Sequence, residues 1–216
     1  MYWFTHWFIK ITGFIPWLFG YRAKIYYEDK SIQGRRIKGK AIVMPNHHSV
    51  MDVALHMFVF WSRTLRCLAA ELMYKKNIFM TLMLKLLGYI KVDRDSHDFS
   101  FLGKAEKVLN KKGVIEIYPE SRLARPGEEK PLEFKPSVVY LALSTGAPII
   151  PVYHTGALFK KERALVIIGK PIDVKEWYDD TLGERENIEI ICKKLRERVI
   201  ELGNELERQR KEEKAR

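Results

Sequence analysis

The segment 46–52, Asn-His-His-Ser-Val-Met-Asp, brings together residue types that can move a proton. A histidine takes up a proton near neutral pH, and a carboxylate beside it fixes the tautomer of the ring and stabilises the imidazolium. A tight turn can fold Asp52 back toward either His47 or His48. Ser49 is placed to cap a following helix by accepting a hydrogen bond from a free backbone N–H. The segment indicates acid–base chemistry, with a surface loop before a capped helix as the structural alternative.

The elements around this segment alternate between the two kinds of regular structure. Apolar, mostly β-branched runs bordered by Gly or Pro predict strands at 24–28, 41–45, 65–70, 88–93, 114–119, 149–154 and 165–169. Stretches of helical length lie at 50–61, 78–87, 99–110 and 136–144. This alternation predicts an α/β fold with a mostly parallel central sheet flanked by helices. Segment 46–52 then lies between a strand and a helix, where open α/β sheets bind their ligands.

Four blocks of this sequence resemble the glycerolipid acyltransferase family, in particular bacterial 1-acylglycerol-3-phosphate acyltransferases. The family's first block, Asn-His-x-Ser-x-x-Asp, matches segment 46–52 in register. Its second, a strand that follows a glycine and ends in Asp-Arg, matches 88–94. Its third, usually Phe-Pro-Glu-Gly-Thr-Arg, is similar to Tyr-Pro-Glu-Ser-Arg at 118–122, which is one residue shorter. Its fourth, an apolar strand around a proline, matches 147–152. All four come in the family's order.

The resemblance implies roles for individual residues. His47, rather than His48, occupies the position of the catalytic base, and Asp52 that of its orienting partner. No serine or cysteine nucleophile, cofactor or metal is implied, so the acceptor hydroxyl attacks the thioester directly. Arg94 and Arg122 are expected to bind the acceptor's phosphate, because guanidinium groups hold phosphate through paired N–H bonds.

Other residues of the blocks are expected to support these. Lys91 and Ser121 are expected to assist the arginines in binding the acceptor. Glu120 is expected to be structural or to support the acceptor site by pairing with one of these arginines. For each basic residue, and most of all for Lys91, a solvated ion pair is the alternative. The remaining matched positions are expected to be structural: Asn46, Ser49, Gly88, Pro119 and Pro151. Pro151 is expected to shape a strand edge.

Two positions depart from the family's pattern. Ser121 replaces a glycine and adds a side chain where the backbone approaches the ligand, although its hydroxyl can also bond a phosphate. Pro136 replaces a glycine often found after the third block. Both bear on which acceptor the rim of the site admits.

The N-terminal segment 1–20 is rich in aromatic residues and contains three of the chain's five tryptophans. It has the length of a spanning helix but carries His6 and Lys10, together with Gly13 and Pro16, which interrupt a straight span. Tryptophan and tyrosine favour the headgroup region, and basic residues follow directly. We expect a broken helix lying in one leaflet. The alternatives are a helix that caps the protein's own core and a helix that spans the membrane.

The charge distribution separates the body of the chain from its C-terminus. The whole chain carries +11, whereas segment 184–216 has ten basic and nine acidic residues, so the body carries 11 − 1 = +10. Segment 184–216 is therefore expected to be an amphipathic charged helix, docked on the acyltransferase domain (21–183) or a partner through one apolar stripe. A basic tail for nucleic acid is excluded. Cys67 and Cys192 fit no metal or redox spacing.

These observations lead to one main hypothesis. The chain is expected to move a fatty acyl group from acyl-carrier protein or acyl-CoA to the sn-2 hydroxyl of lysophosphatidic acid, at the cytoplasmic face of the cell membrane. The anionic membrane surface is its expected partner, and residues 1–20 its peripheral or monotopic attachment. The alternatives are a sibling acyltransferase acting on glycerol 3-phosphate, another lysophospholipid or an aminolipid, and a non-catalytic protein that binds anionic membranes. The apolar stretches 53–61 and 79–87 are expected to be buried core, with the wall of an acyl-chain tunnel or a membrane-facing wall as the functional alternative.

Overall fold

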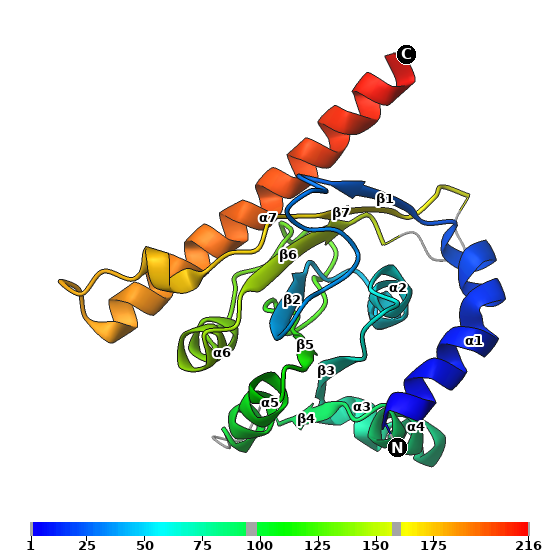
Figure 1. Cartoon of the computed structure of the whole chain (residues 1–216), viewed down its shortest axis with the longest axis horizontal. Helices are drawn as coiled ribbons and strands as arrows, with labels where there is room; N and C mark the ends of the chain where they lie inside the picture. Colours follow the sequence, from blue (N-terminus) through cyan, green and yellow to red (C-terminus); the bar gives the residue numbers. More distant parts are fainter. Residues whose placement is uncertain (1, 94–98, 157–160, 216) are drawn as a thin grey trace.

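A computed structural model describes residues 2–93, 99–156 and 161–215. Seven strands form one sheet in the order β1-β7-β6-β2-β5-β3-β4 (Figure 1). Their bounds are β1 Lys24–Tyr27, β2 Ala41–Pro45, β3 Leu65–Ala70, β4 Ile90–Val92, β5 Val114–Glu116, β6 Ile149–His154 and β7 Leu165–Ile168. Each lies within a predicted strand, including the weakly patterned 65–70.

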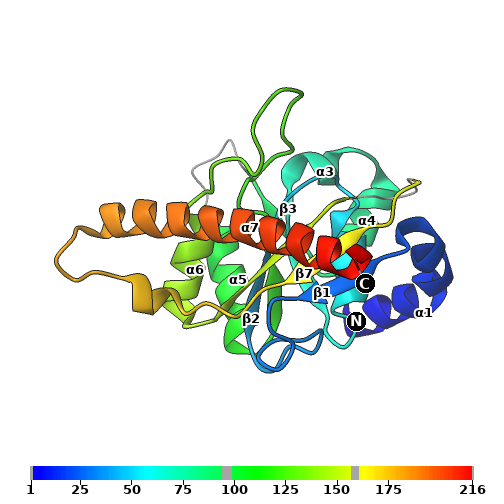
Figure 2. The ribbon, with the colours of Figure 1, turned by 90° about the horizontal axis from the view of Figure 1, so that it is seen from above.

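The helices pack on both faces of this sheet (Figures 1 and 2). They are α1 Tyr2–Tyr21, α2 Asp52–Val59, α3 Glu71–Lys75, α4 Ile78–Leu86, α5 Ser100–Asn110, α6 Ser137–Thr145 and α7 Glu184–Ala215, with a 3-10 turn at Val174–Trp177. The sequence did not predict α3 or the 3-10 turn, which are the shortest of these elements.

The prediction of a mostly parallel sheet is confirmed, with one exception. All neighbouring strands run parallel except β6 and β7, which pair antiparallel from Val152↔Ile168 to His154↔Val166. A parallel neighbour requires a crossover of about a dozen residues or more. The link 155–164 between β6 and β7 is shorter than that, so the chain reverses direction instead.

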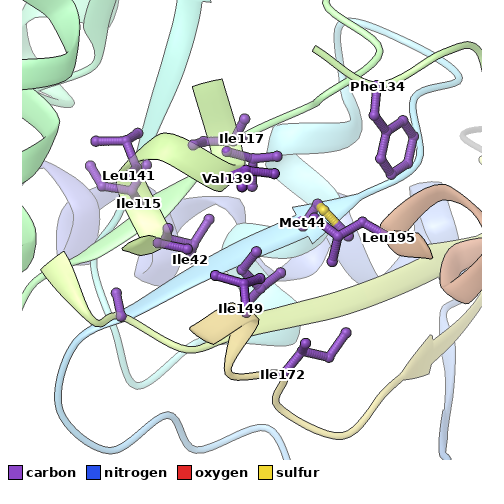
Figure 3. Packing of buried hydrophobic residues seen from close by; sticks show 14 of the residues in the cluster. Ile42, Met44, Ile115, Ile117, Phe134, Val139, Leu141, Ile149, Ile172 and Leu195 are labelled. Carbon is purple, nitrogen blue, oxygen red and sulfur yellow. The ribbon is translucent and has the colours of Figure 1, made fainter. Parts of the chain in front are cut away.

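Alternate side chains of the strands enter two separate cores. On one face Ile42, Met44, Ile115 and Ile149 meet side chains of α6 and α7, such as Leu141 and Leu195 (Figure 3). On the other face Val43, Ile150 and Val166 pack against α2 and the end of α1. Burial on both faces explains why the strands read as continuous apolar runs.

Helix α7 lies across the sheet and extends past its edge (Figure 2). Its apolar stripe faces the body of the protein, and all the stripe residues are buried: Ile188, Ile191, Leu195, Val199, Leu202 and Leu206. Gly203 lets the helix approach β6 closely, since a Cβ there would lie 3.0 Å from the ring of Tyr153.

The predicted break in the N-terminal helix is wrong. Helix α1 continues through Gly13 and Pro16 as one element of 20 residues. Gly13 instead makes room for α2, because a Cβ there would lie 3.2 Å from the ring of Phe58. Within the described part of the chain, no helix combines the length and apolar character that crossing a membrane requires.

Candidate active site

The carboxyl ends of three adjacent strands meet at segment 46–52. This segment follows β2, the loop 117–122 follows β5, and His154 ends β6, and both β5 and β6 pair with β2. The neighbours of β2 lie on its two sides, and open α/β sheets commonly bind their ligands at the carboxyl ends of such strands.

His47 and Asp52 form a hydrogen-bonded pair. The Nδ1 of His47 lies 3.0 Å from Asp52 Oδ2, and the side chains are 13% and 2% exposed, respectively. An N–H on Nδ1 that donates to the carboxylate leaves Nε2 as the nitrogen that accepts a proton. No described residue forms a hydrogen bond with that Nε2. The pair can therefore act as an oriented base.

Asp52 holds the whole turn in place. Its Oδ2 also accepts the backbone N–H groups of His48 at 2.7 Å and Ser49 at 2.8 Å. Burial acts to raise the Asp52 pKa, but the hydrogen bond with His47, nearby His154 and these N–H groups outweigh it and lower the pKa to about 2. The carboxylate is thus ionised whenever His47 is required to accept a proton.

The ring of His48 points to a different partner. Its Nε2 lies 2.8 Å from the amide nitrogen of Asn46, and it packs so closely on Gly156 that a Cβ there would lie 2.6 Å from the His48 Cβ. Burial lowers the His48 pKa. Asn46 also exchanges hydrogen bonds with the backbone of His154, at 3.0 and 2.9 Å. Asn46 and His48 therefore fasten the end of β2 to the end of β6.

Ser49 acts differently from the predicted helix cap. Its Oγ accepts the N–H of Met51 at 3.2 Å, whereas α2 begins at Asp52 without a side-chain cap. The hydroxyl therefore stabilises the turn ahead of the helix. Tyr21, at the end of α1, donates its hydroxyl to Met51 O at 2.6 Å and ties the same turn to the N-terminal helix.

Glu120 supports His47 through the backbone. Its Oε1 accepts the N–H of His47 at 2.8 Å and its Oε2 accepts that of Leu132 at 2.9 Å. Burial raises the Glu120 pKa, and these N–H groups oppose the rise. Its described partners are therefore backbone groups instead of the predicted arginine. Pro119, directly before it, is buried and accepts the N–H of Lys135 at 2.9 Å.

The third block continues into Ser121 and Arg122. Ser121 has a φ of 59°, the left-handed region that favours the glycine it replaces. The guanidinium of Arg122 makes paired bonds to Glu128 at 2.7 and 2.8 Å, and its side chain is 44% exposed. Arg122 is thus solvent-accessible but shares its charge with an exposed carboxylate.

The second block is only partly within the described residues. Arg94 lies outside them. Lys91 donates to Glu71 Oε1 at 2.9 Å and is half-exposed, which corresponds to the ion-pair alternative for this residue. Gly88 has a φ of 68°, and a Cβ on it would lie 2.8 Å from the ring of Tyr2, so glycine is required there.

Pro151 lies inside the sheet rather than at a strand edge. It belongs to β6, between β7 and β2, at the register position opposite Met44. Its carbonyl accepts the N–H of Gly169, directly after the last β6–β7 pair. A proline is tolerated in this internal strand because the antiparallel ladder has already ended on that side.

Sequence reasoning missed a buried polar group behind the pair. His154 is fully buried, with Nε2 3.0 Å from Asn46 O and 3.7 Å from Asp52 Oδ2, and burial lowers its pKa to about 3. His56 and Glu116 are also fully buried, with His56 Nδ1 2.7 Å from Glu116 Oε1. His56 and Glu116 could each have been noticed, because each is a polar residue within an apolar run. Their contact could not have been predicted, because they lie far apart in the sequence.

Comparison with known proteins assigns this chain to a family. The family model described as Acyltransferase matches residues 23–155, which contain all four blocks. The chain belongs to the glycerolipid acyltransferase family. The matched region contains β1 to β6 and excludes β7, α1 and α7.

The relatives of this chain have low sequence identity to it. A 1-acyl-sn-glycerol-3-phosphate acyltransferase from Limnanthes alba is 28% identical over 190 residues, which cover 81% of this chain and 63% of that protein. One from Borreliella burgdorferi is 30% identical over 128 residues, covering 57% and 50%. This chain thus spans less than two thirds of these relatives' length.

A solved structure shares the fold. The 1-acyl-sn-glycerophosphate (LPA) acyltransferase PlsC from Thermotoga maritima superimposes with a TM-score of 0.58 at 21% identity, covering 84% of this chain and 73% of that one.

Proposed function

We propose that this protein is a 1-acylglycerol-3-phosphate O-acyltransferase, which transfers a fatty acyl group from an acyl thioester to the sn-2 hydroxyl of lysophosphatidate. The observation that carries the proposal is the His47–Asp52 pair, joined at 3.0 Å at the carboxyl edge of the sheet. Relatives described as 1-acyl-sn-glycerol-3-phosphate acyltransferases support the choice of acceptor.

The reaction needs one base and no covalent enzyme intermediate. His47 Nε2 accepts the proton of the acceptor hydroxyl while its oxygen attacks the thioester carbonyl carbon. The carbon–sulfur bond then breaks, and the proton on His47 passes to the departing thiolate. Asp52 keeps the imidazole in the required tautomer and stabilises its positive charge between these steps.

The phosphate of the acceptor is assigned to Arg122 and Arg94. Arg122 follows Glu120, which binds the His47 backbone, so one loop supports the base and carries a cation. The Arg122–Glu128 ion pair is exposed, and exposed pairs contribute only about 0–1 kcal/mol, so a phosphate can replace the carboxylate at small cost.

The acceptor is a lipid, and one face of α1 suits contact with a bilayer. The other face is held by the protein: Lys10 donates to the carbonyl oxygens of Trp61 and Arg63 at 2.7 and 2.6 Å, and the ring of Trp17 stacks on Phe58 with centroids 5.2 Å apart. The outward side chains are large and exposed: Trp3, Phe4, Phe8, Ile11, Phe14, Ile15, Leu18 and Phe19. A contiguous apolar surface of this kind is typical of an interfacial helix.

The proposal is tested with purified protein in detergent, one labelled acyl thioester and a panel of acceptors. Lysophosphatidate should be acylated faster than glycerol 3-phosphate, another lysophospholipid or an aminolipid. A faster rate with one of those would replace the proposed acceptor with that sibling substrate.

The same assay tests the phosphate site. Arg122→Ala should raise the KM for lysophosphatidate by about tenfold or more, the loss expected for charge-assisted hydrogen bonds, and leave the KM for the thioester unchanged. Arg125→Ala removes the same charge from an exposed position of the same loop and should change neither KM. Equal changes in both KM values for Arg122→Ala would indicate a structural role.

A further inference from the structure

Tyr118 lies directly against the proposed base. The ring centroids of Tyr118 and His47 are 4.3 Å apart, with 37° between the ring planes. Tyr118 follows β5 and is the first residue of the third block. Burial and the nearby Glu116 carboxylate raise the Tyr118 pKa well above its ordinary value, so its hydroxyl keeps its proton and acts as a hydrogen-bond donor.

The hydroxyl of Tyr118 is anchored by the buried pair behind it. It donates to Glu116 Oε1 at 2.7 Å, and His56 Nδ1 lies 2.7 Å from the same oxygen and 3.2 Å from the hydroxyl. His56 and Glu116 come from α2 and β5, and neither side chain is exposed. The phenol ring is therefore fixed at both ends, by its backbone and by its hydroxyl.

The buried pair of His56 and Glu116 carries a cost in folding stability. Glu116 Oε2 and His56 Nε2 have no hydrogen-bond partner among the described residues, and each unpartnered buried polar atom costs about 1–3 kcal/mol. Apolar residues of similar volume often serve such a site equally well or better. The arrangement is better explained by what it holds in place than by the stability it adds.

His47 needs such a support because its own hydrogen bond leaves one motion free. The bond from Nδ1 to Asp52 fixes one atom of the ring, but the ring can still tilt about that contact. The ring of Tyr118, whose centroid lies 4.3 Å from that of His47, restricts this tilt. The face of this ring is electron-rich, so it also attracts the imidazolium that forms when His47 accepts the proton.

We infer that Tyr118, held by Glu116 and His56, is a positioning residue that sets the orientation of the His47 ring for proton transfer. The inference rests on the proposed function, in which His47 is the base. Small errors in the placement of a reacting group reduce rates strongly, by up to about a hundredfold per ångström.

The kinetic test compares Tyr118→Phe with Tyr74→Phe. Tyr74 is a matched control, because it is also partly buried, donates its hydroxyl to Tyr89 O at 3.0 Å and makes no ring contact with His47. Tyr118→Phe should lower kcat by about tenfold or more while both KM values stay unchanged, and Tyr74→Phe should change kcat by less than about twofold. Equal kcat values in the two variants, or a higher KM at unchanged kcat, would overturn the inference.

A second measurement needs no acceptor and separates this inference from the proposed function. In protein with ¹³C-labelled histidine, the NMR signals of the His47 ring should shift or split in Tyr118→Phe and stay in place in Tyr74→Phe. Unchanged His47 signals in Tyr118→Phe would overturn the inference, whatever acceptor the enzyme uses. If the wild-type protein acylates no acceptor while these signals move, the proposed function fails and the positioning of His47 stands.

Discussion

At the scale of single residues, the structure distinguishes two adjacent histidines. The ring of His47 faces Asp52, whereas that of His48 faces Asn46. We predict that His47→Ala lowers kcat by about 10²–10⁴-fold, the usual contribution of a positioned base, and that His48→Ala keeps most of the activity. Steady-state kinetics with circular dichroism as a folding control checks this. A dead His48→Ala beside an active His47→Ala would reverse the assignment.

Asp52 gives a pH-dependent contribution to stability. Its folded pKa of about 2 lies below the ordinary value of 3.8, so its contribution is complete above about pH 4 and is lost as the pH falls toward 2. We predict that the difference in unfolding free energy between wild type and Asp52→Asn shrinks by about 2 kcal/mol between pH 6 and pH 2. Urea titrations at both pH values measure it. A difference that does not change with pH would show that these partners do not lower the pKa of Asp52.

At the scale of elements, the turn that contains Ser121 is strained. Ser121 holds a φ of 59°, where a side chain costs about 1–2 kcal/mol and glycine costs little. Ser121→Gly should therefore raise the free energy of unfolding by about 1 kcal/mol. Ser137→Gly, at the start of α6, should instead lower it by about 0.5 kcal/mol because that position is helical. Calorimetric or urea unfolding of both variants gives the comparison, and destabilisation by Ser121→Gly would mean that its hydroxyl stabilises the loop.

At the scale of the whole molecule, we propose that the surface for membrane attachment is made by several elements. Besides α1, the exposed apolar residues Leu72, Ile78, Phe79 and Leu82 lie on α3 and α4. Ile9 of α1 packs in the same cluster as Met80 and Met83 of α4, so the two helical regions adjoin. Deleting α1 would also open this cluster, and substitutions on its exposed face therefore test membrane binding more cleanly.

We predict that Phe4→Ser combined with Ile11→Ser weakens binding to anionic vesicles by about a hundredfold or more, since each apolar side chain contributes about 1.5–3 kcal/mol. Wild-type binding should survive high salt, because apolar burial is not screened. Ile32→Ser with Tyr140→Ser removes exposed apolar groups elsewhere and serves as the control. Vesicle sedimentation measures binding. If both double variants bind vesicles equally, the surface is not the attachment site. The same follows if Phe4→Ser with Ile11→Ser slows turnover of a short-chain soluble acceptor as much as turnover of a bilayer-embedded one.

The sequence alone determined the positions of the seven strands and of the longer helices, and it pointed to the family. Continuous apolar runs such as 41–45 predict strands buried on both faces, and the spacing of His47 and Asp52 within a matched block points to the base. These features depend on local periodicity and on residues close together in the chain, so one sequence displays them.

Only the tertiary structure decided which side chains meet. Tyr118, Glu116 and His56 come together because β5 pairs with β2 and α2 packs above them, and His154 reaches Asp52 because β6 lies on the other side of β2. The course of α1 through Pro16 was equally hidden, because its buried face exists only where Phe58 and the carbonyl oxygens of Trp61 and Arg63 receive it. Contacts between residues distant in sequence are set by strand order and packing, and no local pattern encodes them.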